Sequence, residues 1–233
     1  MRMQMMRAGL VAIGLAAAIG SNSAPVTAHT MRMVDYVCPI DGEKFSAATT
    51  MSYTVFGQRL DGRPIGALPV PTMHPVCPTS GFMMYKAEFS AEEIGVARRL
   101  VESDEYRRLK QTETPHFLAA VMAERVGEPV EMVAYMYQEA AWGVEGEGAR
   151  HDRYLRAAIG KIQAFLDSLP ADDKRRIYAR VRIVELLRQV GDFAAAEDAL
   201  AALSGNALAQ MPRLATTLKE LRARIAARDP IPM

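Results

Sequence analysis

A short turn motif, Cys-Pro-x-x-Gly, occurs twice in this chain and constrains its fold more than any other feature. It begins at Cys38, with the sequence CPIDG, and again at Cys77, with the sequence CPTSG. The proline of such a turn stiffens the backbone, and the glycine permits a positive φ angle. The chain of 233 residues has no other cysteine. The two turns are therefore predicted to form one paired structural unit.

The two turns have the outline of a zinc knuckle, in which the sequence Cys-Pro-x-Cys-Gly supplies two thiolate ligands. In this chain Asp41 and Ser80 stand where the second cysteine of each knuckle would be. The sequence therefore predicts a ribbon scaffold that has lost half of its metal ligands, which we call a degenerate zinc ribbon.

Residues 1–28 have the pattern of a cleaved Sec signal peptide. Arg2 and Arg7 make the amino-terminal region positive, and the apolar run 8–19 is too short to span a bilayer. Small residues precede His29, where the mature chain is expected to start, and no cysteine lies near this position to carry a lipid. We therefore expect a periplasmic or secreted protein with no stable membrane anchor after cleavage.

Export changes the interpretation of the two cysteines, because disulfides persist in oxidising compartments. A disulfide between Cys38 and Cys77 is favoured, and closing a loop of about 40 residues would stabilise the fold by ~4 kcal/mol in the chain-entropy model. The alternative is a metal site, with zinc as its ion, made by both thiolates, His74 and Asp41. A redox-active pair is disfavoured, since the chain has no Cys-x-x-Cys motif. Apart from the zinc alternative, no cofactor is predicted.

Soft metal ligands are dense around the second turn. Such ligands would suit Cu(I), although methionine also fills gaps in small cores. The cluster comprises Met73, His74, Cys77, Met83 and Met84. A copper site would also need a second positioned histidine, and sequence spacing does not indicate one. The candidates are His74, His116 and His151, while His29 would add an imidazole beside the new amino terminus.

The balance of charges argues against a nucleic-acid-binding protein. The chain has 28 basic and 27 acidic side chains, which leaves no basic surface for phosphates.

Signatures of hydrolases, phosphate-binding loops and dinucleotide-binding turns are missing as well. Glu145 and Glu147, in a glycine-rich turn, are expected to face solvent, and Trp142 to lie in the core. The chain is accordingly predicted not to be an enzyme.

Residues 29–89 are predicted to form a ribbon-like segment. Strand-favouring residues fill 49–60, a turn follows at Asp61, and prolines between 63 and 75 indicate an extended loop. Residues 31–37 are interpreted as an extended lead-in. Three aromatic side chains have more apolar surface than so small a ribbon can bury, so we expect them to dock on helices. They are Phe45, Phe56 and Phe82.

Residues 90–128 are predicted to form connecting helices. Ser90 begins a capping box with Glu93, and a further helical turn is expected around 105–109. Thr114 then precedes a proline at a first helical position, and this helix is expected to stop at Gly127.

Amphipathic helices are predicted to fill residues 129–228, with a break at 204–206, before a tail at 229–233. The run from Gly191 to Phe193, followed by Ala196, is typical of the turn between paired tetratricopeptide helices. The predicted fold is therefore mainly α: a tetratricopeptide-like antiparallel helical array with a small N-terminal β-ribbon. An ordinary helical bundle with alanine-rich contacts is the alternative.

Together the two halves resemble a bacterial family of unknown function that joins a zinc-ribbon-like Cys-Pro-x-Cys-Gly segment to tetratricopeptide-like helices. The resemblance rests on the first turn, the stretch Phe56 to Asp61, the second turn with Pro75 before it, and the helices around Trp142 and Tyr154. The family has no assigned activity, so the resemblance implies an architecture and no reaction.

Two functions follow as hypotheses. The first is an exported, non-enzymatic protein-interaction module, because paired helices form curved surfaces that usually bind extended peptide segments. Its partner would be a protein or peptide, and nucleic acid is not expected. The alternative is a periplasmic protein that binds zinc or copper through the knuckle region.

Overall fold

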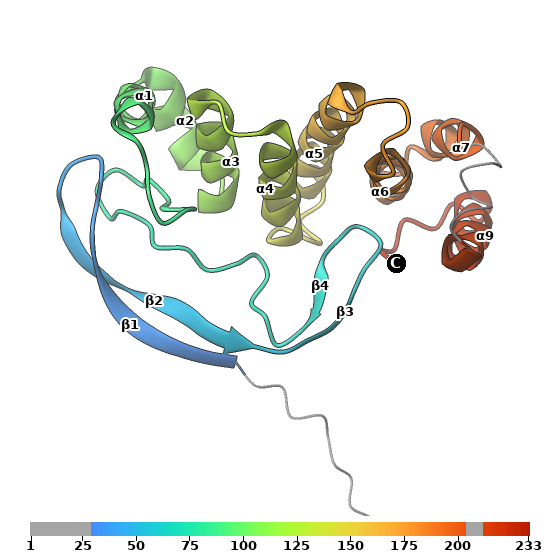
Figure 1. Cartoon of the computed structure of the whole chain (residues 1–233), viewed down its shortest axis with the longest axis horizontal. Coiled ribbons are helices and arrows are strands. Elements are labelled where there is room, and N and C mark those ends of the chain that lie inside the picture. The colour runs from blue at the N-terminus through green and yellow to red at the C-terminus, as the bar shows by residue number, and fades with distance from the viewer. Residues whose placement is uncertain (1–28, 204–211) are drawn as a thin grey trace, which may run out of the picture.

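The computed structural model describes residues 29–203 and 212–233, and within them the fold is mainly helical. Figure 1 shows the helices side by side in a row, with two β-hairpins and a long connection along one side. We call this connection, residues 67–90, the extended segment. Successive helices of the row pack against one another, as α3 does with α4, α4 with α5, and α5 with α6. The predicted signal peptide and the predicted break at 204–206 lie outside the described residues.

The row contains eight helices in the described part of the chain. They are α1 (Ala91–Val101), α2 (Asp104–Thr112), α3 (Pro115–Val126), α4 (Val130–Trp142), α5 (Ala149–Ser168), α6 (Arg175–Gln189), α7 (Phe193–Ala201) and α9 (Pro212–Ala226). None of the helices that the structure describes is both long enough and apolar enough to cross a membrane.

The predicted helix ends at the start of the row are confirmed. Ser90 and Glu93 make both hydrogen bonds of a capping box at α1. The Thr114 side chain accepts from the backbone N–H of Phe117 at the start of α3, which ends at Gly127 with φ of 87°. The short turn expected around 105–109 is instead the full helix α2, because the side chain of Ser103 caps its first turn.

The first Cys-Pro-x-x-Gly turn is the turn of a β-hairpin. It joins β1 (His29–Val37) to β2 (Lys44–Tyr53), which pair antiparallel with Val37 opposite Lys44. Residues 31–37 are extended, as predicted, but they belong to the paired strand β1 and are not a lead-in, because the turn returns the chain alongside them. The strand predicted at 49–60 is two strands: β2 begins earlier, at residue 44, and β3 (Val55–Gln58) follows it after a break. β3 pairs with β4 (Pro64–Gly66), which lies inside the predicted loop at 63–75.

The two Cys-Pro-x-x-Gly turns have the same backbone hydrogen bonds. Cys38 N donates to Glu43 O (2.8 Å) and Gly42 N to Cys38 O (2.9 Å). In the second turn Cys77 N donates to Phe82 O and Gly81 N to Cys77 O, both at 2.8 Å. Both glycines have a positive φ, 79° and 74°. The repeated sequence therefore produces a repeated turn, as glycine's freedom at that position allows.

A disulfide joins the two turns, as predicted. Cys38 and Cys77 are fully buried, with their Cα atoms 5.6 Å apart. The turns are also fixed to the helices, since Arg98 of α1 donates to Ile40 O (2.9 Å) and Tyr106 of α2 to Gly81 O (3.1 Å). The knuckle region is thus part of the main core rather than a separate ribbon.

The three aromatic side chains expected to dock on helices behave differently. Phe82 is 1% exposed and meets Phe89 edge to face, with ring centroids 5.1 Å apart. Phe45 is partly buried against the core and stacks on Tyr36. Phe56 is 57% exposed, so its prediction is wrong. The turn between β3 and β4 bonds to α4 and α6 through Asp61, whereas every residue of β3, including Phe56, is exposed.

Candidate functional site

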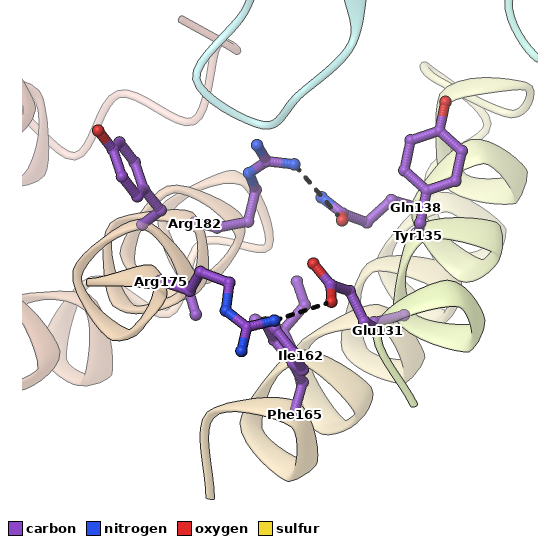
Figure 2. Close-up of a pocket in the computed structure, with 10 residues that line it drawn as sticks. Glu131, Tyr135, Gln138, Ile162, Phe165, Arg175 and Arg182 are labelled. Atoms are coloured by element: carbon purple, nitrogen blue, oxygen red, sulfur yellow. Dashed lines mark hydrogen bonds and ion pairs between the residues drawn. The ribbon is translucent and has the colours of Figure 1, made fainter. Parts of the chain in front are cut away.

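A groove opens between α4 and α6, with α5 behind it (Figure 2). Its cavity volume is about 210 Å³. Each helix contributes residues spaced three or four apart, which is the spacing of one helical face. From α4 come Glu131, Ala134, Tyr135 and Gln138; from α5, Ile162 and Phe165; and from α6, Arg175, Tyr178, Ala179 and Arg182.

Arg182 gives the groove a positive charge that no carboxylate neutralises directly. Its Nη1 donates to the backbone carbonyl of Asp61 (3.1 Å) and lies 3.5 Å from Gln138 Oε1, and it makes no ion pair with any described residue. Burial lowers the pKa of the Arg182 guanidinium, while the nearby Asp61 carboxylate raises it, and arginine stays charged in proteins. A partly desolvated cation of this kind favours an anionic ligand.

The rest of the groove combines aromatic surface with a second arginine. Tyr135 is 43% and Tyr178 58% exposed, on opposite walls. Arg175 lies 3.5 Å from Glu131 across the groove and 2.7 Å from Asp173. Exposed tyrosines and arginines are the side chains that contribute most at protein interfaces. The groove therefore suits an extended segment with both apolar and acidic groups.

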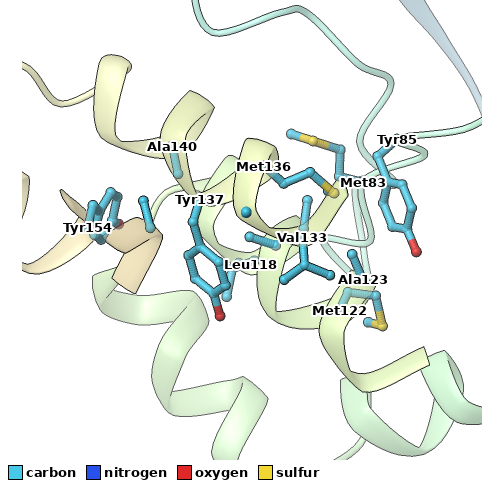
Figure 3. Packing of buried hydrophobic residues seen from close by; sticks show 14 of the residues in the cluster. Met83, Tyr85, Leu118, Met122, Ala123, Val133, Met136, Tyr137, Ala140 and Tyr154 are labelled. Carbon is cyan, nitrogen blue, oxygen red and sulfur yellow. The ribbon is translucent and has the colours of Figure 1, made fainter. Parts of the chain in front are cut away.

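A second pocket, which we call the histidine–methionine pocket, lies between the extended segment, α3 and α4. Its cavity volume is about 220 Å³. His74 and His116 both line it, with ring centroids 6.5 Å apart. The other lining residues are Thr72, Met83, Tyr85, Ala119, Met132, Tyr135, Met136 and Glu139. Figure 3 shows Met136 of α4 next to Met83 of the extended segment.

Thr72 fixes the position of the extended segment against this pocket. Its backbone N–H (3.3 Å) and its hydroxyl (2.6 Å) donate to Glu139 Oε1, and its carbonyl lies 2.7 Å from His116 Nε2. Glu139 is a buried carboxylate of α4, which is why it needs these donors. The predicted extended loop at 63–75 is thereby attached to two helices at once.

Asp61 is a buried residue that accepts hydrogen bonds from several elements, whereas the sequence analysis treated it only as a turn residue. Its carboxylate accepts from Arg59, from the backbone N–H of Arg63 (3.0 Å) and from Gln189 (3.3 Å). Its carbonyl accepts from Gln138 (2.8 Å) and Arg182. Asp61 therefore ties the turn between β3 and β4 to α4 and α6, beside the groove.

Glu145 is more than a solvent-facing residue of a glycine-rich turn. Its carboxylate forms ion pairs with Arg59 and Arg63. The prediction for Glu145 was therefore incomplete, because partners more than 80 positions away cannot be read from its local sequence. Trp142 is 3% exposed, which confirms its predicted place in the core.

The alternative zinc site at Cys38, Cys77, His74 and Asp41 is not the arrangement found. Both sulfur atoms are used by the disulfide, and Asp41 is exposed and accepts from the backbone N–H of Glu43 (3.0 Å). Among residues 29–203 and 212–233, no group of three or more His, Cys, Asp or Glu side chains could hold a metal ion. His74 instead faces His116.

The other members of the soft-ligand cluster are spread apart. Met83 lines the histidine–methionine pocket with His74, whereas Met73 is 41% exposed and Met84 does not line the pocket. His29 lies 3.2 Å from Thr50 in the first hairpin. Burial lowers the pKa of His151 on α5, against the opposing effects of Glu145 and Asp152. The sequence analysis missed Met132 and Met136, which look like ordinary residues of an amphipathic helix.

The structure defines the class of this protein as an antiparallel helical array joined to a disulfide-linked pair of turns. Comparison with protein-family models gave no match, and comparisons with curated proteins and with solved structures gave none either. The resemblance to the bacterial zinc-ribbon and tetratricopeptide-like family consequently stays a prediction.

Proposed function

We propose that the protein is an exported, non-enzymatic interaction module with a tetratricopeptide-like array, and that it binds an extended peptide segment in the groove between α4 and α6. The disulfide supports an oxidising compartment. The antiparallel packing of α4, α5 and α6, which leaves faces of α4 and α6 on either side of a cavity, supports the tetratricopeptide-like description.

Arg182 is the observation that carries this proposal. It places a guanidinium that forms no ion pair with the described residues in a groove whose walls are exposed tyrosines. A carboxylate on the bound segment would form a charge-assisted hydrogen bond with Arg182, and apolar side chains on either side would pack on Tyr135 and Tyr178. The peptide class is therefore one with an acidic side chain between apolar or aromatic residues.

Selection of peptides from a random 12-residue phage-displayed library on the purified protein should enrich this class. Synthetic versions of the selected peptides should bind, and replacing their acidic residue by its amide should weaken binding about tenfold or more. Fluorescence anisotropy gives the dissociation constants. Peptides enriched without an acidic position would contradict the role of Arg182.

Variants of the groove separate this site from binding elsewhere. Tyr178→Ala removes an exposed side chain and should weaken binding about tenfold without lowering the melting temperature. Arg182→Gln should remove the preference for the acidic peptide over its amide. Arg156→Gln on the exposed part of α5 is the matched control and should change nothing. Equal affinities for wild type and Tyr178→Ala would exclude the groove, and robust hydrolytic or redox turnover would exclude a non-enzymatic protein.

A further inference from the structure

The histidine–methionine pocket brings together side chains that the sequence keeps far apart. His74 belongs to the extended segment and His116 to the first turn of α3, and 42 positions separate them. Met83 and Met136 are buried, and Met132 is partly buried. The five side chains come from three parts of the chain and line one cavity. Two imidazoles and three thioethers therefore line the same cavity.

The hydrogen bond of His116 leaves one of its ring nitrogens available as a ligand. A carbonyl oxygen can only accept, so the Nε2 that lies 2.7 Å from Thr72 O carries the proton. In the neutral ring the lone pair is then on Nδ1. A backbone carbonyl that fixes the tautomer in this way is the usual partner of a metal-binding histidine.

The lining of the pocket also includes one carboxylate, that of Glu139. Glu139 already accepts hydrogen bonds from Thr72 and Tyr135. The charged and titratable groups lining the pocket are thus His74, His116, Glu139, Tyr85 and Tyr135.

The ligand set identifies the class of metal. Zinc sites use three or four nitrogen, oxygen or thiolate ligands, and no such group exists in the described residues. Two imidazoles with thioether sulfurs are a soft set, and soft sulfur ligands select Cu(I). Two imidazoles bound to one ion at about 2.0 Å in a tetrahedral site place their ring centroids roughly 5 Å apart. The observed separation of 6.5 Å therefore requires the two rings to move closer together when the ion binds.

We propose that the histidine–methionine pocket binds one Cu(I) ion, with His74 and His116 as nitrogen ligands and Met83 and Met136 as thioether ligands. This site is independent of the proposed peptide groove, although Tyr135 lines both cavities. It also differs from the knuckle site considered from the sequence, because neither cysteine takes part.

Competition with a chromophoric Cu(I) chelator under anaerobic conditions tests the proposal on the purified protein. We expect one Cu(I) per chain. His74→Ala and His116→Ala should each weaken Cu(I) binding by about 100-fold or more, and Met83→Leu with Met136→Leu by about 10-fold or more. His29→Ala and His151→Ala are matched controls, because both histidines lie outside the pocket, and neither should change the affinity.

Spectroscopy distinguishes loss of a ligand from loss of the fold. X-ray absorption at the copper edge should show both nitrogen and sulfur scatterers, and the sulfur signal should fall in the double methionine variant. Ag(I), a redox-inert substitute, should shift the imidazole NMR signals of His74 and His116 and leave His151 unchanged. Cu(I) binding that survives in the double variant His74→Ala with His116→Ala, a site without sulfur, or no binding at all would each overturn the proposal.

Discussion

Replacing Arg188 by leucine should lower the free energy of unfolding by about 3–5 kcal/mol, the largest effect that we expect from any single substitution. Arg188 and Glu185 are both 0% exposed and form an ion pair, with Nη2 2.7 Å from Oε1. The guanidinium also donates to the carbonyls of Asp229 and Ile231. Leucine would leave the Glu185 carboxylate buried without its cation and would remove these two hydrogen bonds to the C-terminal tail.

Urea denaturation followed by circular dichroism measures this loss. Arg156→Leu makes the same chemical change at an exposed position of α5 and should shift the free energy of unfolding by less than about 0.5 kcal/mol. The double variant Glu185→Leu with Arg188→Leu should recover part of the loss, because it removes the unpaired charge. A double variant as unstable as the single one would show that charge burial is not the cause.

Removing the disulfide should have the second-largest effect. The double variant Cys38→Ala with Cys77→Ala should lose up to about 4 kcal/mol, since 39 positions separate the bridged residues. The two turns dock on α1 and α2 through Arg98 and Tyr106, so loosening them exposes part of the main core. Helix content should stay near that of wild type, while residues 43–76 become sensitive to protease.

Melting curves and limited proteolysis measure both effects. A reducing agent should reproduce them in the wild-type protein, and EDTA should leave the stability unchanged. The single variant Ser80→Ala keeps the bridge and serves as the control for a change inside the second turn. Destabilisation by EDTA but not by reductant would mean that the turns hold a metal ion.

Features encoded by neighbouring residues could be predicted from the sequence. The caps of α1 and α3 depend on residues three positions apart, and the disulfide on having two cysteines in matching turns. The strand β1 could not be predicted, because residues 31–37 become a strand only through pairing with β2. Phe56 was wrongly predicted to dock on the helices, because a strand-favouring sequence does not say which face of the strand meets the core.

The candidate sites depend on long-range packing and so escaped prediction. His74 and His116 were named from the sequence only as candidate metal ligands and were not paired, because only the attachment of Thr72 to α3 and α4 brings their rings together. The helices that carry Tyr135 and Arg182 were predicted, but which of their faces would oppose each other was not. Asp61 looked like a turn residue, because its partners Gln138 and Gln189 lie 77 and 128 positions away.

Asp61 also has a consequence for how the array comes apart. In a row of helices that touch only their neighbours, stability is a sum of local terms, and helices can detach one by one from an end. Here the turn containing Asp61 holds α4 and α6 together, and the adjacent Leu60 donates from its backbone N–H to the carbonyl of Met233 (2.6 Å). Detaching that one turn removes hydrogen bonds from α4, α6 and the tail at once. We therefore expect α4 and α6 to unfold together rather than one after the other.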